Sequence, residues 1–341
     1  MSSLALPPSH AAAARRRFGL ALAVATALLA VAGVLTGSDG WSLGAAFDPA
    51  LREVVWQIRA PRTLGAWLTG ALLGLAGAIA QGLFRTPLAD PYLLGSSAGA
   101  GLGVVLVLAA GSLTGHSVQL LAADAASKLG LVGAAFGGAL LGVTLTLLLA
   151  RGAQRTTGLL LAGVVVGVVL GALADLVTLV APEALRGKQV FMLGTTGFLG
   201  WSADLVLALT LIATLPLAQR FSRVLDALTL GEDSARSLGI ALPQVRMLLV
   251  ALLALATGSA VAQAGLVAFI GLVAPHLVRR RVSGTHAHTL TASAAVGGAL
   301  LLAGDVLSRA VVAPEELPVG VLTAVLGGSY LLWLLHRRER G

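Results

Sequence analysis

The chain contains no cysteine and little charge. The absence of cysteine in its 341 residues excludes disulfides and thiolate metal sites. Charged residues make up 11% of the sequence, whereas about 25% is usual in a soluble globular domain. The six histidines lack the i, i+4 pairing of a helical metal site, so we predict that the chain binds no metal. The composition therefore argues against a water-soluble fold.

A phosphate-binding loop is also missing. The pattern G-x-x-x-x-G-K-[ST] does not occur, and the only lysines are Lys128 and Lys188. Lys188 stands between Gly187 and Gln189 and lacks the hydroxyl partner that would hold magnesium. The chain is therefore predicted not to hydrolyse ATP by itself and to bind no cofactor.

Long apolar runs dominate what is present. Apolar residues make up 57% of the chain, and spanning a hydrocarbon layer of about 30 Å takes about 20 mostly apolar residues. Interruptions by charge, proline and turn residues divide these runs into ten segments, of which the eighth is short. The sequence predicts an all-α, polytopic membrane protein with ten transmembrane helices at 18–36, 63–84, 93–111, 129–150, 158–180, 203–219, 243–262, 265–278, 290–312 and 318–336.

The basic residues predict the orientation. Lys and Arg accumulate in cytoplasmic loops, and placing both termini in the cytoplasm puts most of the 23 basic residues there. This topology accounts for the net charge of +8 without a nucleic-acid partner. Arginines at 15–17 precede an apolar run longer than the 7–15 residues of a signal peptide, so we expect a retained first helix. Residues 1–17 are then a cytoplasmic tail, and 18–341 form one transmembrane domain.

Small residues recur at every fourth position in several predicted helices. Gly70 and Gly74 form one such row, and Gly163, Gly167 and Gly171 form another. Residues four apart share one helical face, and small residues let helix backbones approach closely in a membrane. These rows are predicted to be helix-packing faces.

Few acidic residues fall within the apolar segments. Asp175, Asp204 and Asp305 each lie near a predicted helix end, where capping or ion pairing is the expected role. A proton-coupled secondary transporter is an alternative that requires an essential membrane carboxylate, with Asp305 the first candidate. A membrane scaffold without a transport pathway is a third possibility.

Several ordered motifs resemble one family. Residues 58–103 carry Arg-x-x-Arg, a glycine-laced apolar helix and a Pro-Leu-Ala break, and LLLAG follows at Leu159. GLVAFIGLVAPHLVRR occupies 265–280, and ELPVG begins at Glu316. This order resembles the permease subunits of FecCD-type ABC importers for iron chelates, haem and vitamin B12. The resemblance implies a multi-pass permease of the bacterial inner membrane and a homodimer. It also implies two cytoplasmic ATPase subunits, which hold ATP and magnesium, and an extracytoplasmic substrate-binding protein.

The predicted cytoplasmic loop at 221–242 is long for a connection between packed helices, which is about 2–8 residues. Glu232 and Asp233 suit the positive start of a short helix, and Gly239 suits its left-handed end. Exposed leucines and alanine would give this helix a surface for a partner. The resemblance implies that the loop couples the permease to its ATPase through Leu230, Gly231, Glu232, Asp233, Ala235, Arg236, Leu238 and Gly239.

The resemblance assigns two further sets of residues. Arg59, Arg62 and Arg309, predicted to lie outside, match positions where the family docks acidic residues of its binding protein. The cytoplasmic gate of the family maps to Thr86, Leu88, Thr156 and Thr157. The substrate stays open between a siderophore, haem and a corrinoid, with an iron siderophore favoured by its frequency in the family.

Overall fold

The protein is a bundle of helices, as a computed structural model shows for residues 8–37, 40–41, 49–113, 125–150, 156–282 and 284–339. Two short antiparallel strands, β1 (Thr36–Gly37) and β2 (Gly40–Trp41), are the only ones among these residues. The all-α prediction is therefore confirmed. The helices are α1 (Pro8–Leu35), α2 (Pro49–Val54), η2 (Val55–Arg59), α3 (Ala60–Phe84), η3 (Pro91–Leu94), α4 (Ser96–Leu113), α5 (Ala125–Leu149), α6 (Thr156–Val180), α7 (Glu183–Leu193), α8 (Trp201–Arg220), α9 (Ser222–Thr229), α10 (Glu232–Ser237), α11 (Leu242–Ala264), α12 (Ile270–Arg281), α13 (His286–Ala310) and α14 (Val319–Glu339).

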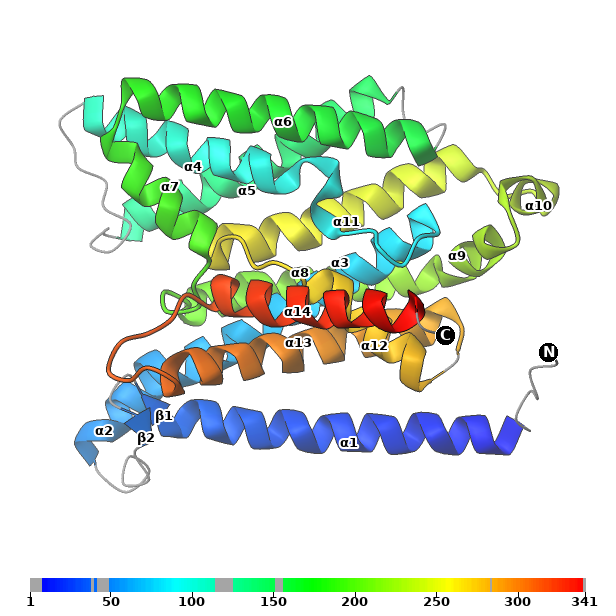
Figure 1. Ribbon diagram of the computed structural model, residues 1–341, viewed down its shortest axis with the longest axis horizontal. Helices are drawn as coiled ribbons and strands as arrows, with labels where there is room; N and C mark the ends of the chain where they lie inside the picture. The colour runs from blue at the N-terminus through cyan, green and yellow to red at the C-terminus, as the bar shows by residue number, and fades with distance from the viewer. Residues whose placement is uncertain are drawn as a thin grey trace.

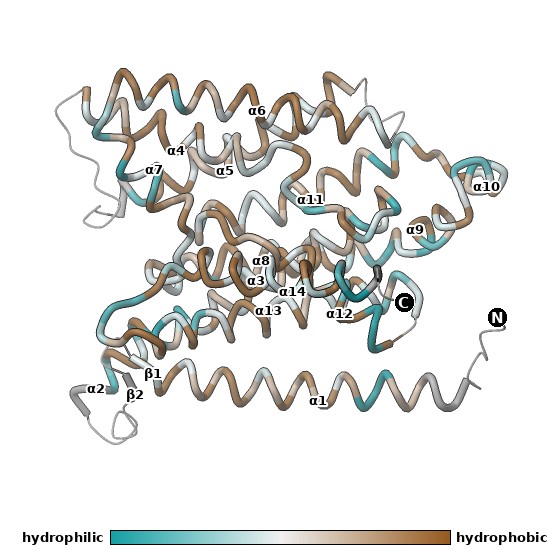
Figure 2. Tube along the Cα trace, in the orientation of Figure 1, coloured by the Kyte–Doolittle hydropathy of each residue, from teal (hydrophilic) through white to brown (hydrophobic). Residues whose placement is uncertain are grey.

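The long helices lie side by side, so the bundle has two ends (Figure 1). We call the right-hand end in that view, with α9 and α10, the α10 end, and the opposite end, with α2 and the two strands, the α2 end. The start of α1 and the end of α14 both lie at the α10 end. Hydrophobic residues dominate the long helices, and hydrophilic ones gather towards the two ends (Figure 2). Two polar ends separated by an apolar middle are the pattern expected of a membrane protein.

Eight of the helices that the structure describes are long and apolar enough to cross a membrane. Each corresponds to one of the ten predicted segments. The other two predicted segments are also helical, but α12 has 12 residues and the apolar part of α14 covers only Val319–Leu334. The eight long spans run over Ala12–Leu35, Arg52–Phe84, Ser96–Leu113, Lys128–Leu149, Thr157–Val180, Trp201–Arg220, Leu242–Ala264 and His286–Ala310.

Two helix starts differ from the predicted ones. The first helix begins at Pro8 and so includes part of the predicted tail, while residues 1–7 lie outside the described part of the chain. The helix predicted at 265–278 begins only at Ile270, because Gly265 and Phe269 adopt left-handed backbone angles, with φ of 70° and 67°. Pro275 lies within this helix. A proline removes only one backbone donor, and neighbouring elements in a bundle can compensate for that loss.

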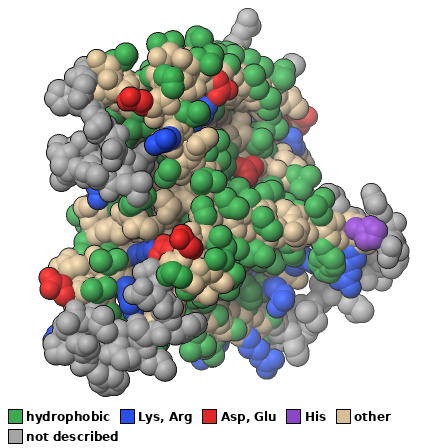
Figure 3. Space-filling view, turned by 60° about the vertical axis from the view of Figure 1, so that its left-hand side comes forward, with side chains coloured by type: hydrophobic (Ala, Val, Ile, Leu, Met, Phe, Trp, Pro, Cys, Tyr) green, Lys and Arg blue, Asp and Glu red, His purple; other side chains and the backbone are tan. Residues whose placement is uncertain are grey.

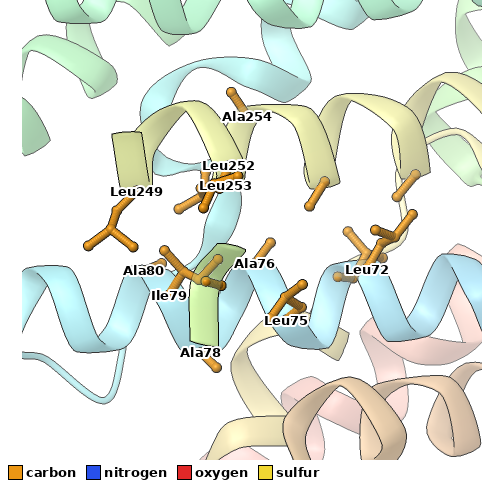
Figure 4. Packing of buried hydrophobic residues seen from close by; sticks show 14 of the residues in the cluster. Leu72, Leu75, Ala76, Ala78, Ile79, Ala80, Leu249, Leu252, Leu253 and Ala254 are labelled. Carbon is orange, nitrogen blue, oxygen red and sulfur yellow. The ribbon is translucent and has the colours of Figure 1, made fainter. Parts of the chain in front are cut away.

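Helix α3 is the centre of the bundle. It packs against α8, α11, α12 and α13, and nearly all of its residues are buried. In Figure 4, Ala76, Ile79 and Ala80 of α3 face Leu249 and Leu253 of α11. Alanine, glycine and leucine make up most of α3, and its buried residues share one hydrophobic cluster with those of α11. This packing fixes the position of both ends of α3, each of which carries predicted site residues.

Glycines bring α3 and α13 into close contact, as predicted for Gly70 and Gly74. A Cβ atom at Gly74 would overlap the carbonyl oxygen of Ser293, and one at Gly70 would overlap that of Gly297. Only glycine leaves room for such an approach of two helix backbones. This part of the packing prediction agrees with the structure.

The second glycine row behaves differently. A Cβ atom at Gly163 would overlap the carbonyl oxygen of Leu93, but one at Gly167 or Gly171 would meet nothing within 4 Å. Gly167 and Gly171 therefore pack against no other helix within the described part of a single chain, and the prediction that they form a packing face stays a prediction for contacts between subunits. The reason is that α6 lies at the edge of the bundle and turns much of its surface outward (Figure 1).

Candidate functional site

The predicted coupling segment forms two short helices at the α10 end. Helix α10 begins at Glu232, as predicted, and ends at Ser237, with Leu238 as its C-cap. Gly231 and Gly239 flank it with φ of 108° and 76°. Glycine adopts these left-handed angles without the steric cost that a Cβ atom would impose. The predicted capped helix is thus confirmed.

The apolar surface of this segment is smaller than predicted. Leu230 and Leu238 are 72% and 66% exposed, as a contact surface requires. Ala235 is fully buried and belongs to the main hydrophobic cluster, so its predicted place on the contact surface was wrong. Since α10 turns one face to its own chain, the exposed apolar side chains that it offers a partner are the leucines at its two ends.

Glu232 has ion-pair partners that the sequence did not reveal. It lies 2.5 Å from Nη2 of Arg246 on α11 and 3.4 Å from Nη2 of Arg85 at the end of α3. Arg236 of the same helix lies 3.7 Å from Glu232 and 3.4 Å from Asp233. Arg85 is 147 residues away in sequence, so no local pattern could have predicted this contact.

Helix α9 is attached to α13 by a second polar contact. Asp226 accepts a hydrogen bond of 2.9 Å from the backbone N–H of His286 and lies 2.7 Å from Nδ1 of the same residue. The His286 ring also lies close to Gly82 in the last turn of α3. The coupling segment is thus held to three of the long helices, α3, α11 and α13.

The predicted gate segment follows α3 directly. Arg85 ends the helix with a left-handed φ of 53°, which is uncommon for a residue with a side chain. The Thr86 hydroxyl accepts a 3.4 Å hydrogen bond from the N–H of Leu88, and the Leu88 side chain is exposed. Two prolines, Pro87 and Pro91, prevent a continuous helix here.

Polar contacts hold the other side of this break in place. The Asp90 side chain accepts a 2.8 Å hydrogen bond from the N–H of Tyr92, whose hydroxyl donates to the Val267 carbonyl at 3.0 Å. Burial raises the pKa of the Asp90 carboxyl although the Tyr92 N–H lowers it. Burial and the Asp90 charge together raise the pKa of the Tyr92 hydroxyl.

The second half of the predicted gate lies at the start of α6. Thr157 is exposed there, and the side chain of Thr156 lies outside the described residues. Leu93 of η3 packs against Gly163 one to two turns further along α6. The first turns of α6 and the break after α3 are thus connected through η3.

The arginines assigned to binding-protein docking lie at the α2 end and are buried within the chain. Arg62 pairs with Asp305 and with Glu316, each at 2.9 Å. Arg309 is 1% exposed, pairs with Asp305 and donates to the carbonyls of Gly33 and Thr36 at 2.8 and 2.6 Å.

Arg59 is also buried and donates to the carbonyls of Val34 and Leu35 at 3.4 Å. The chain itself therefore occupies the guanidinium groups that a partner's carboxylates would need. In this conformation the three arginines join α1, α3 and α13 and cannot act as exposed docking contacts.

The three membrane aspartates differ from one another. Asp305 is fully buried between Arg62 and Arg309 and accepts a 2.6 Å hydrogen bond from Thr196. Asp175 pairs with Lys188 on the surface. Pairing is confirmed for these two. Asp204 lies in the first turn of α8, near a helix end as predicted, and its carboxyl oxygens are buried without a hydrogen-bond partner in the described part of the chain. Over the same residues, no group of three His, Asp or Glu side chains could hold a metal ion.

This arrangement defines a multi-pass membrane protein whose short α9 and α10 helices project at one end. Sequence comparison identifies its family: residues 19–337 match the FecCD transport family, and the chain belongs to it. It is 37% identical to the hemin transport system permease protein HmuU of Yersinia pestis over 323 residues, covering 93% of this chain and 95% of HmuU. It is 39% identical to the vitamin B12 import system permease protein BtuC of Shigella boydii over 327 residues, covering 95% and 96%.

Solved structures agree with the family. A metal-chelate type ABC transporter in an inward-facing conformation superposes with a TM-score of 0.82 at 26% identity, covering 93% of this chain and 98% of that one. PsaBC from Streptococcus pneumoniae shares the fold alone, with a TM-score of 0.54 at 17% identity over 85% and 92% of the two chains. The chain is a permease subunit of an ABC importer in the bacterial inner membrane. It is not an enzyme, because ATP hydrolysis belongs to separate subunits.

Proposed function

We propose that this permease imports a metal chelate: an iron siderophore, haem or a corrinoid. The observation that carries the proposal is the match, over nearly the whole length of both chains, to permeases of hemin and vitamin B12. The structural similarity to a metal-chelate type transporter supports the same substrate class. All three candidates are bulky chelates, so they make similar demands on the width of a pathway.

The proposed assembly is a homodimer with two ATPase subunits at the α10 end and a substrate-binding protein at the α2 end. The α10 end is then cytoplasmic, consistent with the arginines that end α12 there. Leu230 and Leu238 supply exposed apolar contacts for the ATPase. Arg59, Arg62 and Arg309 are buried in this conformation, so exposed side chains near them at the α2 end would make the first contact with the binding protein.

The proposed gate lies at the same end as the ATPase contact. Leu88 is exposed in the break after α3, and Thr86 stabilises that break through its hydrogen bond to Leu88 N–H. Thr156 and Thr157 begin α6 and complete the gate in this proposal. ATP binding by the ATPase subunits docked at α9 and α10 would open or close this constriction.

Uptake into proteoliposomes tests the function directly. The chain is reconstituted with its ATPase and binding protein, and entry of radiolabelled iron siderophore, haem and cobalamin is measured with ATP and without it. ATP-dependent uptake of one of them establishes the importer and identifies its substrate class. If an intact complex with an active ATPase takes up none of the three, the proposed substrate class is wrong.

A further inference from the structure

One carboxylate at the α10 end joins three parts of the chain. Glu232 lies 2.5 Å from Arg246, 3.4 Å from Arg85 and 3.7 Å from Arg236. Arg246 lies on α11, Arg85 is the residue that ends α3, and Arg236 lies on α10 itself. Glu232 is thus the point at which the proposed coupling helix meets two membrane helices.

The contact with Arg246 fixes α10 to the bundle. The Arg246 side chain is 2% exposed, so this ion pair is shielded from water and from salt. A charge-assisted pair of this kind is strong and directional, and separating it would leave a buried charge without compensation. Helix α10 and the first turn of α11 are therefore expected to move together.

The contact with Arg85 is of another kind. Its side chain is 39% exposed and its distance to Glu232 is longer, so this pair is weaker and can break and re-form. Arg85 is also the left-handed residue between the end of α3 and Thr86. Arg85 adjoins the proposed gate without a flexible linker. A displacement of its guanidinium group therefore acts directly on the backbone of the break after α3.

We propose that Glu232 is a positioning residue that transmits the movement of α10 to the gate through Arg85, with the buried Arg246 pair as the fixed side of the link. The proposal rests on the proposed function, in which α10 contacts the ATPase and the break after α3 is the gate. The ion pair between Arg85 and Glu232 holds the non-helical segment after α3 in one position. When α10 and the first turn of α11 are displaced, this ion pair separates and the segment is free to move.

The test uses Arg85→Gln, which keeps Glu232 and Arg246 intact and removes only the weaker contact. Arg280→Gln is the matched control, because Arg280 is an exposed arginine at the same end with no ion-pair partner among the described residues. Arg85→Lys keeps the charge and should restore the behaviour of the original chain. All three are compared in the complete importer.

Two quantities are measured: substrate imported per ATP hydrolysed, and thiol labelling of Leu88→Cys with and without nucleotide. The chain has no cysteine of its own, so the label reports Leu88→Cys alone within this subunit. Arg85→Gln should lower the import ratio at least about fivefold and abolish the nucleotide dependence of labelling, while Arg280→Gln changes neither.

The possible outcomes distinguish a failure of the proposed link between Glu232 and Arg85 from a failure of the proposed importer function. If Arg85→Gln retains both the ratio and the nucleotide-dependent labelling, the link is wrong and the importer assignment stands. If Leu88→Cys labelling does not depend on nucleotide even without the Arg85 change, the gate assignment fails and the link fails with it. If Arg85→Gln only lowers the amount of complex, with ratio and labelling retained, Arg85 is structural and the proposal is overturned.

Discussion

At the scale of single residues, the buried ion cluster at the α2 end dominates the energetics. Asp305 is fully buried and offsets the positive charges of Arg62 and Arg309, which come from two different helices. Removing one member of a buried ion pair lowers the stability far more than replacing the whole pair by apolar residues, because the remaining charge is left without compensation. The cluster therefore acts as a single unit that fixes α3 and α13 to each other.

We expect Asp305→Ala to destabilise the fold by about 3–5 kcal/mol, because it leaves two buried arginines without their shared carboxylate. The check is the thermal unfolding midpoint of the purified permease in detergent. Asp175→Ala is the matched control, since Asp175 pairs with Lys188 at the surface, where such a pair contributes less than about 1 kcal/mol. Equal midpoints for the two variants would refute the structural role of the cluster.

The sequence predicted the place of these charges but not their surroundings. Hydropathy and Arg-x-x-Arg put Arg59 and Arg62 at a helix entry, which is where they lie. Arg62 is buried against Asp305, which is 243 residues away in sequence, and Arg59 is buried against backbone carbonyls of α1. Long-range pairing of this kind leaves no local pattern, and the same limit hid the arginine partners of Glu232.

At the scale of elements, local rules predicted helices well and their contacts only in part. Apolar runs located each long helix, and a glycine-bounded acidic start located α10. Helices α2 and α7 were missed because they are short and lie outside the long apolar runs. The glycine rows showed which faces could approach another helix, but the bundle decides which of them do.

The contact between α3 and α13 depends on Gly74. We expect Gly74→Ala to cost about 1–3 kcal/mol, because the added methyl group would overlap the Ser293 carbonyl and push the two helices apart. Gly19→Ala on α1 should be neutral or slightly stabilising, since nothing lies within 4 Å of that glycine and alanine favours a helix. Unfolding midpoints of the two variants in detergent decide the matter. An unchanged unfolding midpoint for Gly74→Ala would mean that α3 and α13 can move apart at little cost in stability.

Helix α10, the proposed coupling helix, yields a prediction that distinguishes an effect on folding from an effect on partner binding. Leu238→Glu should leave the unfolding midpoint unchanged and weaken ATPase binding by more than about 1 kcal/mol, because Leu238 is exposed. Ala235→Glu should instead lower the midpoint, since it buries an unpaired charge in the main cluster. Co-purification with the ATPase and thermal unfolding give the two readouts. Normal ATPase binding by Leu238→Glu would remove the leucine from the contact surface.

At the scale of the whole molecule, the two edges of a single chain differ in the residues that they turn outward. Helices α1 and α6 lie at opposite edges of the bundle (Figure 1). Hydrophobic side chains are spread over the visible surface between the charged groups (Figure 3). Both edge helices are outward-facing and apolar, but α6 also carries Gly167 and Gly171 in register on an open face. Lipid requires no small residues, whereas a second helix backbone does.

The open glycine row on α6 is therefore expected to pack against the second subunit of the proposed homodimer. Gly167→Leu should dissociate the dimer without unfolding the chain, because a Cβ atom at this position meets nothing within 4 Å in its own subunit. Gly19→Leu on α1 is the matched control, since that glycine likewise has no neighbour within 4 Å. Mass measurement of the detergent-purified permease by light scattering distinguishes dimer from monomer. A dimeric Gly167→Leu protein would exclude this face as the subunit interface, because a leucine side chain cannot fit where two helix backbones touch.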